Sequence, residues 1–180
     1  MADNFNDALK KSIDYQQHIK PALEKVFMGY LITVEGDTLD ETAKLLDTLS
    51  GIDLWMVDES RGMRGIASRI QYDKNWRTFT VRAERDSGAK TEYEKRKYAI
   101  DNDYLYPIVT YQAYIDGGLA SVGVAYTKDI IDYIDKGLAH VKHTRGDQRG
   151  QASFYVIQWD RFKANGYKFT EISVPMGLTA

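Results

Sequence analysis

Gly51-Ile52-Asp53-Leu54, followed by Gly65-Ile66-Ala67-Ser68-Arg69-Ile70, is the stretch of sequence that decides the fold. At this point the spacing of apolar residues changes from the helical period to the alternation of strands. We expect strands over residues 52–58, 64–72 and 77–85, with turns at Ser60-Arg61-Gly62 and Asp73-Lys74-Asn75. Because short loops join antiparallel neighbours, the three strands are predicted to form a meander.

Helices are predicted before and after this meander. Residues 5–27 carry apolar side chains at three- and four-residue steps, with Pro21 kinking or dividing the helix. Thr38 and Glu41 form a capping box that starts a second helix, which ends at Ser50-Gly51. Further along we expect helices at 91–99, 128–140 and 159–165, strands at 106–115, 119–126 and 153–158, a polar loop at 141–151, and a frayed end.

This order of elements predicts one α/β domain with a central mixed sheet, an antiparallel meander and flanking helices. The chain has 180 residues, of which 43% are hydrophobic, and no linker-like segment divides it. We divide it into N-terminal helices (1–50), a sheet core (51–126) and a C-terminal helix, strand and short helix (127–180).

Composition excludes several classes of protein. With no cysteine there is no disulfide framework, thiolate nucleophile or Cys-type zinc site. The longest apolar run is too short to span a bilayer, and the first residues lack the pattern of a signal peptide, so we expect no membrane partner and a cytoplasmic location.

Charge is distributed unevenly along the chain. Residues 61–97 contain eleven basic and five acidic residues, a net charge of +6, whereas the whole chain carries −2. A basic middle on an acidic body is typical of a local face that binds a polyanion, although solvated hairpin faces would give the same pattern.

The strand pair also carries the outline of a metal-dependent phosphodiesterase. A carboxylate on one strand and an acid-x-lysine on the next hold Mg²⁺ beside a scissile phosphate, since alternation puts residues i and i+2 on one face. Residues 51–70 resemble the core of the PD-(D/E)XK nuclease superfamily: Asp53 matches its first acid, whereas Ala67 replaces the second acid and Arg69 replaces the lysine. The resemblance implies restriction-endonuclease-like topology and a Mg or Mn cofactor.

A longer pattern is similar to uncharacterised small proteins of phages and mobile elements. It comprises Ile66-Ala67-x-Arg69-Ile70-Gln71, Thr78-Phe79-Thr80-Val81-Arg82 and Asp86-Ser87-Gly88-x-x-Thr91-Glu92-x-x-Lys95. This resemblance implies a phage or mobile-element origin, and therefore the cytoplasm of a host cell. It also implies that Ala67 belongs to a group in which the usual acid is absent or relocated.

The candidate catalytic residues are Asp53, Arg69 and Glu84, with Asp53 and the carbonyl oxygen of Gln71 as metal ligands. Glu84 would complete the site from the third strand, or an acid of the second helix, Glu41 or Asp47, would do so. Arginine stays protonated and grips phosphate but cannot act as a base. The predicted nucleic-acid contacts are Arg69, Arg82, Arg85, Lys90, Lys95, Arg145 and Arg149.

Two functions stay open at this point. The protein is either a Mg- or Mn-dependent nuclease, or it binds DNA, RNA or a host protein without cleaving anything, as an accessory or counter-defence factor. A purely structural alternative for Arg69 is an ion pair with Asp53 that holds adjacent strands together.

Overall fold

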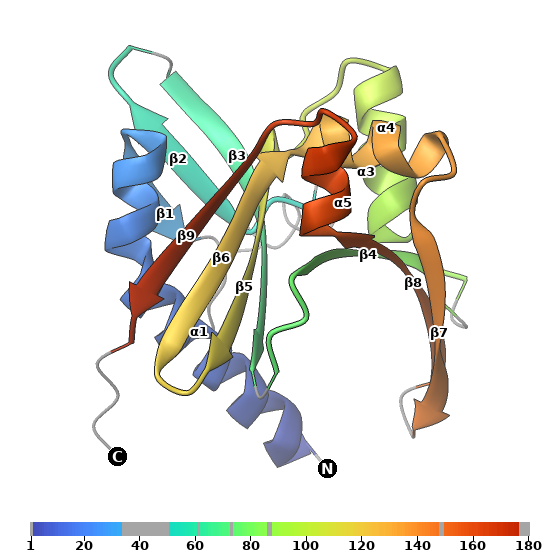
Figure 1. Cartoon of the computed structure of the whole chain (residues 1–180), viewed down its shortest axis with the longest axis horizontal. Helices are drawn as coiled ribbons and strands as arrows, with labels where there is room; N and C mark the ends of the chain where they lie inside the picture. The colour runs from blue at the N-terminus through green and yellow to red at the C-terminus, as the bar shows by residue number, and fades with distance from the viewer. Residues whose placement is uncertain are drawn as a thin grey trace.

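The computed structural model describes residues 2–33, 51–60, 62–72, 74–85, 88–147 and 150–176, which form two β-sheets and the helices that cover them (Figure 1). Helices are α1 (Ala2–Phe27), α3 (Glu92–Asp101), α4 (Thr127–Asp135) and α5 (Trp159–Ala164). Strands are β1 (Tyr30–Thr33), β2 (Leu54–Asp58), β3 (Gly62–Tyr72), β4 (Thr78–Arg85), β5 (Val109–Asp116), β6 (Leu119–Tyr126), β7 (His140–Asp147), β8 (Gly150–Gln158) and β9 (Phe169–Pro175).

The large sheet has the strand order β1-β2-β3-β5-β6-β9, and the small sheet has the order β4-β8-β7. All neighbouring strands are antiparallel except β3 and β5, which are parallel and in register from Ile66–Val109 to Tyr72–Ile115. Because parallel strands need a crossover, the chain leaves the large sheet after β3, adds β4 to the small sheet, and returns through α3 to β5.

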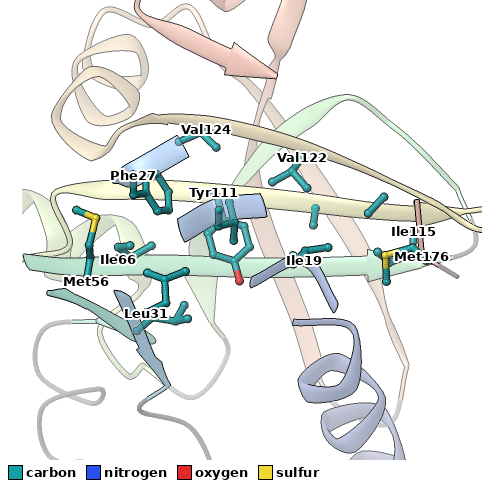
Figure 2. Close-up of a cluster of buried hydrophobic side chains, with 14 residues drawn as sticks. Ile19, Phe27, Leu31, Met56, Ile66, Tyr111, Ile115, Val122, Val124 and Met176 are labelled. Carbon is teal, nitrogen blue, oxygen red and sulfur yellow. The ribbon is translucent and has the colours of Figure 1, made fainter. Parts of the chain in front are cut away.

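One face of the large sheet packs against α1. Ile19, Leu23 and Phe27 lie one or two helical turns apart and belong to one buried cluster with side chains of β3, β5 and β6. Figure 2 shows this cluster. On β5 this cluster takes Tyr111, Ala113 and Ile115, so the alternate residues of the strand point to the opposite face.

A second core fills the space between that opposite face, the small sheet and helices α4 and α5. It is rich in aromatic rings, with Trp159 and Phe162 of α5 against Phe79 of β4. Trp159 lies directly over Gly123 of β6, where an added Cβ would come within 2.5 Å of the indole. This core fixes the small sheet against the large one.

The α/β class, the mixed central sheet and most of the predicted elements are confirmed. The β2–β3 pair is antiparallel as expected, and Thr91 caps α3 with a complete capping box. The β5–β6 turn uses Gly117 and Gly118 at φ values of 56° and 81°, which suit a tight hairpin. Pro21 does not divide α1.

Three expectations about the sheets are wrong. The third strand of the predicted meander, β4, pairs with β8 and not with β3. The polar loop expected at 141–151 is largely β7 and the start of β8, and the frayed end contains β9, which pairs with β6. A single edge strand was also missed at Tyr30–Thr33. The second predicted helix, including Glu41 and Asp47, lies outside the described residues.

No helix in the described part of the chain combines the length and apolar character that crossing a membrane requires.

Candidate functional site

The two sheets meet around a half-open cavity of about 180 Å³, which we call the inter-sheet pocket. In Figure 1 the small sheet arches away from β3 and β5, with β7 at its far edge. Strand alternation decides which side chains reach the pocket: Thr78 and Thr80 of β4 face it, whereas Phe79 and Val81 between and beyond them are buried in the second core. The pocket is lined by Arg69, Gln71, Trp76, Thr78, Thr80, Lys142, Phe154 and Val156.

The mouth of the pocket combines an exposed aromatic ring with two lysines. Trp76, in the segment between β3 and β4, is 54% exposed. The Nζ atoms of Lys74 and Lys142 lie 3.9 and 5.2 Å from its ring centroid. Since Lys142 comes from β7, the far edge of the small sheet, the fold brings these three side chains together from distant parts of the sequence.

A cluster of charged groups adjoins the pocket. Arg69 forms an ion pair with Glu92 of α3, and the other carboxylate oxygen of Glu92 accepts the backbone N–H of Arg82 at 3.2 Å. The guanidinium groups of Arg69 and Arg82 each lie 5.4 Å from the ring centroid of Phe154. Arg96 lies one turn along α3 from Glu92 and is only 6% exposed.

The charges of this cluster oppose the effect of burial. Burial alone would raise the pKa of Glu92, but the charges of Arg69 and Arg96 and the backbone N–H of Arg82 outweigh it and lower the pKa. Burial lowers the pKa of Arg96, which Glu92 and Asp53 partly restore. Three guanidinium groups (Arg69, Arg82 and Arg96) and two carboxylates (Asp53 and Glu92) give the described cluster a net charge of +1.

A hydrogen-bond network joins Gln71, Thr78 and Thr80, which line the pocket, to the buried side chains of Gln112 and Tyr114 on β5. The backbone N–H of Thr80 donates to Oε1 of Gln112 at 2.7 Å, and the Thr80 hydroxyl donates to the same atom at 3.1 Å. Nε2 of Gln112 donates to the Tyr114 hydroxyl at 2.7 Å and to Oε1 of Gln71 at 3.2 Å. The Tyr114 hydroxyl in turn donates to the carbonyl oxygen of Thr78. This chain ties β5 to β3 and β4.

The structure brings Asp53 and Arg69 to the same cluster and places Glu84 elsewhere. Asp53 Oδ2 accepts the backbone N–H of Ser68, so the side chain ties the start of β2 to β3. The structural alternative predicted an ion pair between Arg69 and Asp53, but Arg69 forms its ion pair with Glu92. Glu84 accepts a hydrogen bond from Ser153 Oγ at 2.6 Å.

Glu84 and the pocket lie on different faces of the small sheet. Ser153 alternates with Phe154, which lines the pocket, and a register shift between Arg82 and Glu84 brings Glu84 opposite Ser153. Ser153 Oγ also lies 2.8 Å from Nδ1 of His143. The described residues therefore give Glu84 a place in a polar cross-strand contact away from Asp53.

The predicted nucleic-acid contacts are spread over more than one surface. Arg69 and Arg82 lie at the cluster, whereas Lys90 is exposed, with its Nζ 4.8 Å from the ring centroid of Tyr98. Lys95 is half-buried on α3. Arg85 and Arg145 lie on β4 and β7, but their side chains, and the whole of Arg149, are outside the described residues.

The carboxylates that are described do not by themselves form a site for a divalent metal. No group of three His, Asp or Glu side chains converges within the described ranges. Asp53 and Glu92 have oxygens engaged by backbone N–H groups, and the guanidinium groups around them already supply positive charge. The carbonyl oxygen of Gln71, expected to ligate a metal, accepts from Gln112.

Several residues of this site were missed from the sequence. Glu92 was quoted only as part of the longer pattern, and no role was predicted for Trp76, Lys142 or Phe154 in a common pocket. The one usable signal was the capping box at Thr91. It determines where α3 starts and therefore where Glu92 and Arg96 lie on the helix.

The chain matches no family model, no curated protein and no solved structure with which it was compared. The resemblance to PD-(D/E)XK nucleases and to phage proteins therefore stays a prediction.

Proposed function

We propose that this protein binds nucleic acid at the inter-sheet pocket without cleaving it. The observation that carries the proposal is the exposed Trp76 between Lys74 and Lys142 at the mouth of the pocket. Proteins that track single strands combine ammonium or guanidinium groups, which contact phosphates, with aromatic side chains, on which bases stack. At the mouth of the pocket, the ammonium groups of Lys74 and Lys142 lie 3.9 and 5.2 Å from the centroid of the Trp76 ring.

The charge cluster supports the same chemistry. The net charge of +1 lies beside the pocket, and Arg69, a member of the cluster, also lines it. A guanidinium group on a fixed strand offers donors in a geometry that matches phosphate oxygens. Glu92 holds Arg69 in place from α3, so the donor is positioned before a ligand arrives.

Salt dependence of binding is the direct test, because displaced counterions reveal how many phosphates are contacted. Lys74, Lys142 and Arg69 predict about three contacts, so log K against log salt should have a slope of about −2 on a single strand, at about 0.7 per contact. Fluorescence anisotropy of labelled DNA and RNA oligonucleotides at several salt concentrations measures the slope.

Lys142→Gln should reduce the magnitude of the slope by about 0.7, because one phosphate contact is lost. Lys163→Gln is the matched control: Lys163 is exposed on α5, which packs on the other face of the small sheet, and the change in charge is the same. Equal slopes for the two variants, or no salt-sensitive binding by the wild type, would contradict the proposal.

A metal-dependent nuclease is the second candidate, favoured by the position of Asp53 in the same cluster as Arg69. Incubation with single- and double-stranded DNA and RNA in Mn²⁺ tests it. Cleavage by the wild type that is lost in Asp53→Asn would support the nuclease and contradict the non-catalytic proposal. Salt-sensitive binding without cleavage would support the non-catalytic proposal.

A further inference from the structure

We infer that the inter-sheet pocket accepts one unpaired base that carries a carbonyl oxygen, such as thymine or uracil, so that the protein selects single strands over duplexes. The inference rests on the proposed nucleic-acid function and adds the strand state and the class of base. It follows from the size of the pocket, its aromatic walls and the direction of one side-chain amide.

The size of the pocket suits one planar ring. Its volume is about 180 Å³. For comparison, a protein cavity of about 150 Å³ is known to accept benzene. A ligand the size of a base pair would need far more room, so the pocket can hold a single base and not a paired one.

The walls of the pocket favour a flat, aromatic ligand. Trp76 and Phe154 supply two aromatic rings to the lining, and Val156 adds an apolar contact. Lys74 and Lys142 now lie over Trp76, but both are exposed lysines with flexible stems. A base stacking on the indole can displace them toward the phosphates, since stacking on an aromatic ring is stronger than an exposed cation–π contact.

The polar side of the pocket presents hydrogen-bond donors. The orientation of Gln112 follows from the backbone, because the N–H of Thr80 can only donate and must face Oε1 of Gln112. Nε2 of Gln112 then faces Gln71 and requires the oxygen of the Gln71 amide to point toward it. The NH₂ group of Gln71 is left for the pocket that this residue lines.

These donors favour bases that carry a carbonyl oxygen. The Gln71 amide N–H groups, with the guanidinium group of Arg69, require an acceptor on the ligand. Thymine and uracil carry carbonyl oxygens on their pairing edges, and in a duplex those edges are paired and the ring is stacked between its neighbours. Entry into the pocket therefore requires an unpaired base.

The test compares a labelled oligothymidylate, an abasic sugar–phosphate strand of equal length and charge, and a blunt duplex that contains the same thymidylate strand. Anisotropy at one salt concentration should show that the oligothymidylate binds roughly fivefold or more tightly than the abasic strand, as expected for one stacked base. Oligouridylate presents the same carbonyl edge and should show the same preference over its abasic counterpart.

Gln71→Glu is the sharpest variant, because it keeps the shape and the oxygen that accepts from Gln112 but replaces the NH₂ donor by an acceptor. Its negative charge should weaken binding to all strands, so the readout is the ratio of the thymidylate to the abasic affinity, which should fall toward one. Trp76→Leu should lower the ratio independently, and Lys163→Gln should leave it unchanged.

Different results would contradict the inference about the base and the proposed nucleic-acid function. Salt-sensitive binding that is as tight for the abasic strand or the duplex as for the oligothymidylate would overturn the inference and leave the proposed function standing. Absence of salt-sensitive binding to every strand would overturn the proposed function and the inference with it.

Discussion

Replacing Glu92 by glutamine should destabilise the protein measurably, because it removes the carboxylate from a largely buried charge cluster. Glu92 faces the guanidinium groups of Arg69, Arg82 and Arg96, and the change would raise the net charge of the described cluster from +1 to +2. Removing one partner of a buried ion pair costs about 3–5 kcal/mol. Since the Glu92 and Arg69 side chains are each 23% exposed, we expect a smaller loss of about 2–3 kcal/mol.

The loss should depend on pH, with a sign that follows from the lowered pKa of Glu92. A carboxyl group whose pKa is lower in the folded state stabilises that state fully above its unfolded pKa, about 4.3. Below that pH its contribution falls by about 1.4 kcal/mol per pH unit until the folded pKa is reached. The difference between wild type and Glu92→Gln should therefore be largest near neutral pH and shrink in acid.

Urea unfolding followed by tryptophan fluorescence measures both effects. With an m-value of about 2 kcal/mol/M, the expected loss lowers the midpoint by roughly 1–1.5 M at neutral pH. Glu59→Gln is the control, because Glu59 is exposed on the β2–β3 turn, and its midpoint should hardly move. A shift for Glu92→Gln as small as that of the control, or a shift that persists unchanged in acid, would refute the role given to this side chain.

Two further predictions concern the core and α3. Gly123→Ala would place a Cβ 2.5 Å from the rigid ring of Trp159 and should cost about 3 kcal/mol in urea unfolding; a loss below about 1 kcal/mol would contradict the packing. Burial and the hydrogen bond to Asp135 raise the pKa of Tyr93 to about 12, so its stabilising contribution is present below about pH 10 and is lost as the pH rises through about 12. Ultraviolet titration of Tyr93→Phe should lack one late-ionising tyrosine, and an unchanged curve would count against this environment.

Elements with strong local signals could be predicted from the sequence. The helical spacing of Ile19, Leu23 and Phe27 and the Gly117-Gly118 turn are set by residues close together in the chain. The alternation of Phe79 and Val81 with Thr78 and Thr80 correctly indicated a strand. It could not indicate the partner, because the same alternation suits any neighbour on either sheet.

Strands β7 and β9 were missed for a different reason. β7 is polar along most of its length, since it is the edge of the small sheet and His140, Val141 and Lys142 are exposed. β9 is also an edge strand, half exposed, and its pairing with β6 spans more than forty positions of sequence. A local hydrophobic pattern is weakest in a strand at the edge of a sheet, where fewer of its side chains are buried.

The candidate site was foreseen only in part. Asp53 and Arg69 were singled out from the sequence, and they do lie in one cluster. Arg96 was expected on a phosphate-contact surface, and its burial could not be predicted, because a buried arginine in a charged helix gives the same sequence pattern as a solvated one. Trp76 meets Lys142 and Phe154 because β4 pairs with β8, which is a long-range event.

That long-range pairing also sets the order in which the molecule can assemble during synthesis. The β2–β3 and β5–β6 hairpins join neighbouring segments and can form early. β4 must wait for β8, whose pairing runs from Thr78–Gln158 to Arg85–Ala152. Until residues near 158 leave the ribosome, β4 has no strand partner and its apolar face is uncovered. The pocket is thus completed late in translation, and a nascent chain that stalls before β8 would expose an aggregation-prone strand.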